Sequence, residues 1–315
     1  MKACFIESYG GLEVMQVGEL PVPGLRRGEV RVAIEAASIN PVDAKIRSGD
    51  FRLVTGRAFP RVLGVDLAGT VAELGPHTSG LTVGERVYGT TPIFASCHGS
   101  HAEFAVAAPR ALRRIPAGLS AIEAAALPAA ALTALHGLQG FSELDGRHVL
   151  VNGATGGVGH IALQVAKARG ANITAVASAS SLDFARELGA DEVVDYGAGD
   201  LARVGPRFDV VFDAHGGLGF AAAAPLLTAC GSYVTTHSFP REYLYGWWRR
   251  IRGGRQLVPA RLRAQPEDYA EIEALLGSGQ IRVVIDRVYP LDETAQALEA
   301  LERGGVRGKI VIQVK

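Results

Sequence analysis

Residues 149–159 read Val-Leu-Val-Asn-Gly-Ala-Thr-Gly-Gly-Val-Gly, and this stretch decides the fold. A short apolar run ends at a cluster of glycines. After it, Val158, Ile161, Ala162 and Val165 recur at the spacing of one helix face. A strand, a glycine turn and a helix in this order predict a site for the phosphates of a dinucleotide. Glycines let the backbone approach the pyrophosphate, and the helix N-terminus favours its negative charge.

The surroundings strengthen a motif that is weak by itself, since its glycines depart from the GxGxxG spacing. Apolar runs predict further strands at 171–178, 192–196 and 209–214, and a helix at 182–188. Strands and helices that alternate in this way predict a parallel sheet with right-handed crossovers, the doubly wound α/β class. Methyltransferases and other non-redox proteins share that fold and remain an alternative.

The end of the second strand bears on which dinucleotide binds. NAD sites place an acidic residue there, about 20 residues after the glycine turn. This chain has Ser178-Ala179-Ser180-Ser181 instead, and serine hydroxyls can donate to a 2′-phosphate that a carboxylate would repel. The sequence therefore predicts NADPH, although Asp183 rather than a lysine or arginine is the first charged residue that follows. A merely polar loop is the other interpretation.

Composition sets the broad class. The 315 residues carry no net charge, so nothing indicates bulk attraction to nucleic acid or to an acidic membrane. Cys4, Cys97 and Cys230 are too few and too scattered for a disulfide framework, and with no visible signal peptide they predict a cytoplasmic protein. The alanine-rich stretch 121–138 is expected to be buried helix broken at Pro128, because Glu123 and His136 suit no membrane span.

The pattern of predicted secondary structure changes twice along the chain. Short β-like runs between glycine and proline turns fill residues 1–120, and the α/β pattern fills 121–262. The segment 263–315 is expected to return to the first, β-rich domain, because its last strand needs a sheet to pair with. Its predicted elements are helices at 268–276 and 291–301 and strands at 282–285 and 309–314.

With both halves in view, the chain resembles the medium-chain dehydrogenase/reductase superfamily, and within it the zinc-independent quinone oxidoreductases related to zeta-crystallin. Seven motifs in order carry the resemblance: residues 38–43, 63–71, 84–87, 131–134, the glycine turn, 188–196 and 307–311. The resemblance implies a GroES-like β-rich catalytic domain interrupted by a Rossmann domain, with the active site between them, and a homodimer.

The resemblance also implies that no zinc binds. The zinc-dependent branch has cysteine where this chain has Asn40, and a His–Glu pair where it has Val65 and Asp66. Asn40 and Val65 do not supply the missing ligands. Cys97, His98 and His101 are ligand types, but they lack a fourth partner, and a surface or cleft loop is the favoured interpretation.

Site residues are carried over by position. Asn40 is expected to face substrate or nicotinamide, the alternative being a turn residue before Pro41. Phe51 stands where relatives often have a tyrosine, so the proton donor is open among water, Tyr88 and a histidine. Lys309 is expected to approach the cofactor or to be a solvated strand end, and His215 is read as a loop histidine more than a catalytic one. The cofactor residues implied are Thr133, Thr155, Gly156, Gly157, Val158, Ser178, Ser181, Tyr196, His215, Gly216 and Lys309.

The implied chemistry is hydride transfer from NADPH to a small-molecule acceptor. Without a metal to polarise a carbonyl, quinones and α,β-unsaturated carbonyls are the easiest acceptors, since they delocalise the incoming charge. An enoyl-thioester reductase and a non-catalytic nucleotide-binding scaffold remain alternatives. The segment 242–252 holds both tryptophans and opens a run of arginines up to Arg263. This composition suggests a lid over the substrate cleft, a site for an acidic substrate tail, or an amphipathic helix packed on a second subunit.

Overall fold

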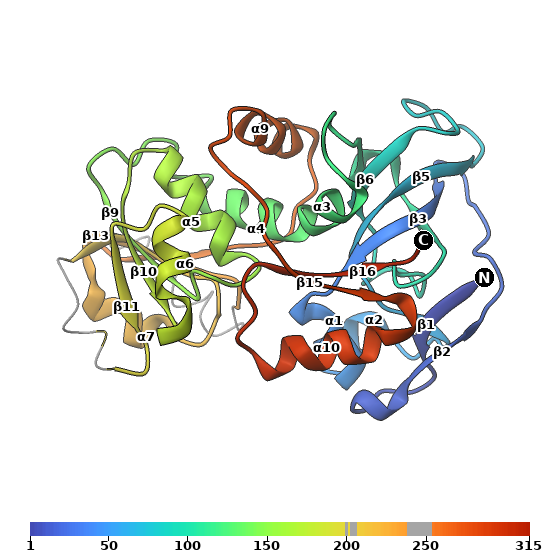
Figure 1. Ribbon diagram of the computed structural model, residues 1–315, viewed down its shortest axis with the longest axis horizontal. Coiled ribbons are helices and arrows are strands. Elements are labelled where there is room, and N and C mark those ends of the chain that lie inside the picture. Colours follow the sequence, from blue (N-terminus) through green and yellow to red (C-terminus); the bar gives the residue numbers. More distant parts are fainter. Residues whose placement is uncertain (199–200, 202–206, 238–253) are drawn as a thin grey trace. The chain divides into compact units, whose positions relative to one another are not determined.

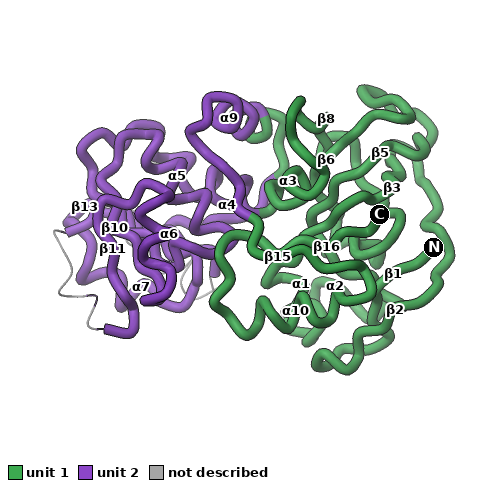
Figure 2. Tube along the Cα trace, viewed as in Figure 1, with its two compact units in different colours: residues 1–129, 264–269, 285–315 green, residues 130–263, 270–284 purple. Residues whose placement is uncertain are grey.

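The computed structural model describes residues 1–198, 201, 207–237 and 254–315. These residues form two compact units (Figure 2). Unit 1 comprises residues 1–129, 264–269 and 285–315, and unit 2 comprises residues 130–263 and 270–284. The tryptophan- and arginine-rich segment 242–252 lies outside the described residues.

The unit bounds differ from the expected domain bounds in two places. Residues 121–129 belong to unit 1 because helix α3 (Ala121–Ala126) packs against four strands of its sheet. Residues 270–284 belong to unit 2. There Glu271 pairs with Arg169 at 2.7 Å, and the Arg282 backbone bonds to the side chain of Gln164.

Unit 1 contains two sheets (Figure 1), in which every strand pairing except that of β15 with β16 is antiparallel. Its larger sheet has the order β15-β16-β3-β5-β6-β8, with β7 paired to β3, and a small sheet has the order β2-β1-β4. Alternating burial along β3 puts Val30, Val32 and Ile34 into the core, as the period-two pattern of a half-buried strand requires. The strands are β1 (Lys2–Ile6), β2 (Met15–Glu19), β3 (Val30–Ser38), β4 (Arg61–Val62), β5 (Asp66–Leu74), β6 (Arg86–Thr90), β7 (Phe104–Ala107), β8 (Leu112–Arg114), β15 (Ile285–Pro290) and β16 (Lys309–Gln313).

The C-terminal strand pairs where the sequence predicts. β16 lies antiparallel to β3 and parallel to β15, and so completes the sheet of unit 1. The helices of this unit are α1 (Pro41–Ser48), α2 (Arg52–Thr55), α3 and α10 (Thr294–Arg303). Helix α9 (Pro266–Gly277) and helix α4 (Pro128–Leu138) each begin in unit 1 and continue in unit 2. Helices α3 and α4 are separated at Leu127, so the expected break at Pro128 is present, and no helix among the described residues is long and apolar enough to span a membrane.

Unit 2 is a parallel sheet with the order β11-β10-β9-β12-β13-β14. Every strand pairing in it is parallel, as the alternation of strands and helices predicts. Its elements are β9 (His148–Asn152), α5 (Gly159–Ala168), β10 (Asn172–Ala177), α6 (Leu182–Glu187), β11 (Glu192–Asp195), β12 (Phe208–Asp213), α7 (Gly219–Ala223), β13 (Leu227–Thr235) and β14 (Gln256–Pro259).

Two expected elements begin later than the sequence predicts. The strand expected at 282–285 is β15, Ile285–Pro290, because the backbone N–H groups of Arg282 and Val284 bond to the side chains of Gln164 and His160 instead of a strand. The helix expected from Leu291 starts at Thr294, after a 310 turn over Leu291–Glu293.

Candidate active site

The glycine turn joins β9 to α5 at the carboxyl edge of the sheet. Gly153 has φ +72°, a left-handed conformation that favours glycine. A Cβ at Gly159 would lie 2.0 Å from the Gly153 carbonyl oxygen, so the helix packs tightly against the turn. A Cβ at Gly156 would meet only that oxygen, at 3.5 Å. The turn is therefore closed on its inner side and open at Gly156, which is what a bound pyrophosphate needs.

A second loop, residues 214–219, is fixed beside this turn by Asp213 at the end of β12. Asp213 is fully buried, and its Oδ1 accepts hydrogen bonds from the Gly216 N–H at 2.9 Å and from Asn152 Nδ2 at 2.8 Å. Its Oδ2 accepts from the Leu218 N–H at 2.9 Å and from Tyr233 Oη at 2.7 Å. Sequence reasoning did not single out Asp213. A carboxylate between an apolar strand and a Gly-Gly loop was the signal that would have found it.

This loop brings His215 and Gly216 to the glycine turn. A Cβ on Gly153 would stand 3.0 Å from His215 Cβ, so the two backbones are in near contact. His215 is exposed, and Gly216 has φ +78° with the His237 ring against it. The four hydrogen bonds that Asp213 accepts thus hold predicted cofactor residues from two separate loops at one edge of the sheet.

The serines after β10 form a small cluster at the same edge. Ser178 Oγ lies 3.2 Å from the hydroxyls of both Ser180 and Ser181. Ser178 is partly exposed and Ser181 is buried. Tyr196 follows the neighbouring strand β11 and is 65% exposed. Residues 178–181 at the tip of β10 include no carboxylate, and this is the position that contacts a nucleotide's ribose in this fold.

The remaining predicted cofactor residues of unit 2 lie in the glycine turn, at the start of α5 and in the middle of α4. Thr155 is buried in the turn, and Gly157 and Val158 are partly exposed at the start of α5. Thr133 lies in α4 and is 9% exposed.

Unit 1 holds a buried charged cluster around Asn40. Lys309 Nζ donates to Asn40 Oδ1 at 2.6 Å and lies 3.5 Å from Asp66 Oδ2. Asn40 Nδ2 donates to the same Asp66 oxygen at 2.9 Å. Asp66 also accepts from Ser38 Oγ at 2.5 Å and from the Ala129 N–H at 2.7 Å. Both ends of the Asn40 amide are therefore engaged inside the protein, in a residue that is 6% exposed.

This arrangement bears on two predictions. Lys309 is 3% exposed, so the interpretation as a solvated strand end is wrong. Asn40 precedes helix α1, and its backbone N–H donates to Asp43 Oδ2 at 2.8 Å, so it also starts the helix as the alternative suggested. A direct contact of Asn40 with substrate or nicotinamide stays a prediction.

Burial shifts the titration of the groups around this cluster. Desolvation raises the pKa of Asp43 to about 7, although the hydrogen bonds from the backbone N–H groups of Asn40 and Gly64 lower it in part. Desolvation also lowers the pKa of Lys309, against the attraction of Asp66 and Asp43. His101 is fully buried, its Nε2 lies 3.3 Å from the Ser38 carbonyl oxygen, and burial lowers its pKa to about 4. An acid–base network inside unit 1 is thus tuned by exclusion of water.

Tyr88 lies in β6 with no exposed surface, and its ring packs edge-to-face on Tyr269 with ring centroids 5.6 Å apart. This burial argues against Tyr88 as the proton donor, because its hydroxyl does not reach a surface where a substrate binds. Phe51 is half-buried, and its ring packs on Phe94.

Comparison with known protein families identifies two domains in this chain. Residues 26–119 match the family described as the alcohol dehydrogenase GroES-like domain, and residues 188–312 match the family described as zinc-binding dehydrogenase. The chain is 35% identical to the chloroplast envelope quinone oxidoreductase homolog of Arabidopsis thaliana, over 99% of this chain and 98% of the relative. It is 33% identical to a 2-methylene-furan-3-one reductase of Solanum lycopersicum, over 99% and 79%. The chain belongs to the quinone oxidoreductases of the medium-chain dehydrogenase/reductase family.

Solved structures extend the match. The quinone oxidoreductase of Coxiella burnetii superposes with a TM-score of 0.92 at 30% identity, over 100% of this chain and 99% of that one. A mycobacterial protein solved in complex with NADPH gives a TM-score of 0.86 at 25% identity, over all of both chains. The expected fold, a GroES-like domain with a Rossmann-like parallel sheet, and the expected oxidoreductase class are confirmed.

In this quinone oxidoreductase, the negative charge of Asp66 is balanced by the positive charge of Lys309. Where the zinc-dependent branch is expected to hold a metal ion, the carboxylate of Asp66 here faces the ammonium of Lys309. Among the described residues, no group of three or more histidine, cysteine, aspartate or glutamate side chains is placed to hold a metal ion. Cys97, His98 and His101 do not converge, since Cys97 Sγ donates to the Ala58 carbonyl oxygen and His101 bonds to Ser38.

Proposed function

We propose that this quinone oxidoreductase uses NADPH to reduce quinones or α,β-unsaturated carbonyls without zinc. The observation that carries the choice of cofactor is the tip of β10, where serine hydroxyls stand in place of a carboxylate beside the glycine turn. The mycobacterial relative solved with NADPH supports it.

The residues in unit 2 fit this cofactor. Gly156, Gly157 and the N–H groups at the start of α5 would hold the pyrophosphate, since the space at Gly156 is open. Ser178, supported by Ser181, and Tyr196 would hold the 2′-phosphate and the adenosine. The loop that Asp213 fixes would lie against the nicotinamide ribose. The bound nicotinamide supplies the hydride, and the chain supplies position and hydrogen bonds.

Cofactor preference is tested by kcat/KM with NADPH and NADH. We expect NADPH to be preferred, and Ser178→Asp to reduce that preference, because a carboxylate there repels the 2′-phosphate and accepts from ribose hydroxyls instead. Ser142→Asp, on an exposed loop elsewhere, is the matched control. Preference for NADH in the unaltered protein contradicts the proposal.

The substrate class follows from the charges of unit 1. Asp66 is already balanced by Lys309, and Asn40 and Val65 are not zinc ligands, so this chain supplies no metal-binding set at that position. An acceptor that delocalises its own negative charge suits such a site. The Arabidopsis and tomato relatives, named for a quinone oxidoreductase and a furanone reductase, support this class.

The decisive assay is NADPH oxidation with a panel of quinones, enones, enals and an enoyl-CoA, with saturated ketones and simple alcohols as controls. Turnover of quinones or enones supports the proposal. Preference for the enoyl-CoA supports the alternative of an enoyl-thioester reductase, and binding of NADPH without turnover of any acceptor supports a non-catalytic scaffold. Activity confined to saturated ketones or alcohols, or stoichiometric zinc in metal analysis, contradicts the zinc-free mechanism.

Two further proposals concern the whole molecule. We propose a cytoplasmic homodimer: the three scattered cysteines support a reducing compartment. Size-exclusion chromatography with light scattering tests the dimer, and fractionation of the native cells tests the location.

A further inference from the structure

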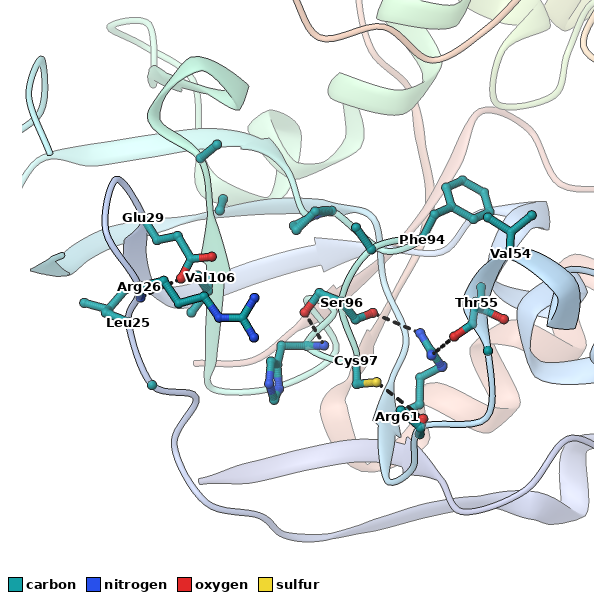
Figure 3. A pocket seen from close by; sticks show the side chains of 18 residues that line it. Leu25, Arg26, Glu29, Val54, Thr55, Arg61, Phe94, Ser96, Cys97 and Val106 are labelled. Carbon is teal, nitrogen blue, oxygen red and sulfur yellow. Dashed lines mark hydrogen bonds between the residues drawn. The ribbon is translucent and has the colours of Figure 1, made fainter. Parts of the chain in front are cut away.

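Unit 1 contains a pocket of about 910 Å³ that is separate from the cluster around Asn40 (Figure 3). Its walls come from four segments, 24–29, 54–61, 92–98 and 106–108. Neither Asn40 nor Lys309 lines it. The proposed function assigns no role to any residue of this wall.

The wall of the pocket contains a buried arginine without a counter-charge. Arg61 is 1% exposed; its Nη1 donates to the Ser96 carbonyl oxygen at 2.9 Å and its Nη2 to that of Thr55 at 2.5 Å. Its Nε has no hydrogen-bond partner, and no carboxylate among the described residues forms an ion pair with it. A guanidinium has five N–H donors, so two carbonyl partners leave it short of both bonds and negative charge. Burial of an unpaired charge is costly, and an anion in the pocket relieves that cost.

A second arginine faces the same space. Arg26 is exposed at the pocket wall, and Figure 3 shows its side chain extending toward the loop that carries Ser96 and Cys97. Burial and the charge of Arg26 lower the pKa of His98 in that loop, and the charge of Glu29 raises it in part. Glu29 is the one carboxylate of the wall, and its Oε2 accepts from the Arg26 backbone N–H at 2.7 Å. Two arginines against one glutamate leave the pocket positive.

The rest of the wall is largely apolar. Phe94 and Val54 lie at the edge of the pocket with 41% and 65% of their surfaces exposed, and Leu25 and Val106 also line it. Apolar surface left in water in a wall that also carries two arginines matches a ligand with an anionic head and an apolar body. We propose that this pocket binds an amphiphilic anion, such as a medium-chain carboxylate or alkyl phosphate, with its head toward Arg26 and Arg61.

Cys97 provides a reporter inside the pocket. It lines the wall and is half-buried, whereas Cys4 is buried and Cys230 is exposed. In a Cys230→Ser background, the rate at which N-ethylmaleimide modifies Cys97 therefore measures occupancy. Decanoate and decyl phosphate are the probes, decanol is the neutral control, and inorganic phosphate is the control without an apolar body.

We expect decanoate or decyl phosphate to slow modification of Cys97 several-fold, and decanol and inorganic phosphate to have little effect. Arg26→Gln and Arg61→Met should each abolish the protection, and Arg27→Gln, an exposed neighbour outside the wall, should retain it. Arg26 is at the surface, so its variant decides the matter if the Arg61 variant does not fold. Equal protection by decanol, or no protection by either anion, overturns the proposal. Whichever anion protects more strongly identifies the head group.

Discussion

Asp213→Asn tests whether one buried carboxylate holds the loop beside the glycine turn. The substitution keeps the size of the side chain and removes its charge. Oδ1 can still accept from Asn152 and Gly216, but an NH2 group then faces Leu218 N–H and Tyr233 Oη. The tyrosine hydroxyl can turn and accept, whereas the Leu218 N–H loses its partner.

The magnitude follows from these four bonds. A hydrogen bond to a charged group contributes about 1.5–3 kcal/mol and a neutral one about 1 kcal/mol. Loss of the Leu218 bond costs about 1.5–3 kcal/mol, and weakening the other three bonds to neutral ones adds to it, so we expect at least about 3 kcal/mol of lost stability. If about 1.4 kcal/mol of the free energy of NADPH binding is then spent on ordering the loop, KM for NADPH rises about tenfold.

The assay pairs urea unfolding with KM for NADPH in three variants. Tyr233→Phe removes one donor from Asp213 and the acceptor of the Gly219 N–H, and should cost about 1.5–3 kcal/mol. Asp209→Asn, on the same strand, breaks a partly exposed pair with Arg147 and should cost at most about 1 kcal/mol without a change in KM. If Asp213→Asn and Asp209→Asn shift stability and KM alike, Asp213 does not position the cofactor loop and the reasoning fails.

Three further predictions concern buried groups. Lys309→Met should lower the free energy of unfolding in urea by about 3–5 kcal/mol, since it leaves Asp66 buried without its cation. Lys315→Met, at an exposed position, should change that free energy little. Gly159→Ala should abolish detectable NADPH binding by fluorescence titration, because its Cβ would overlap the Gly153 carbonyl oxygen, while Gly140→Ala, with open space around it, should bind normally. His101 has its pKa lowered to about 4 from 6.5, so the unfolded chain takes up a proton between these pH values and the folded chain does not. The stability this group contributes at pH 7, about 3 kcal/mol, is therefore lost as the pH falls through that window, and urea titrations of His101→Gln should lack that part of the slope.

Features whose determinants are close in sequence were predictable. The glycine turn, the start of α5 after Val158 and the break at Pro128 each depend on a few adjacent residues and occur where the pattern puts them. Strand β15 begins later than its sequence pattern predicts, because the expected first residues bond to side chains more than 100 positions away. Local β-propensity at 282–285 gave no sign that Gln164 and His160 would occupy those backbone groups.

Asn40 shows the same limit within the site. The motif around it fixes its place before α1, but the direction of its amide is set by Lys309, 269 positions later, and by Asp66. With Oδ1 bound to an ammonium and Nδ2 to a carboxylate, reversing the amide would oppose both charges, so the orientation is fixed by electrostatics. A substitution at Asn40 therefore disturbs two buried charges before it removes any contact with substrate. Loss of activity in such a variant identifies a catalytic role only if its unfolding free energy is unchanged.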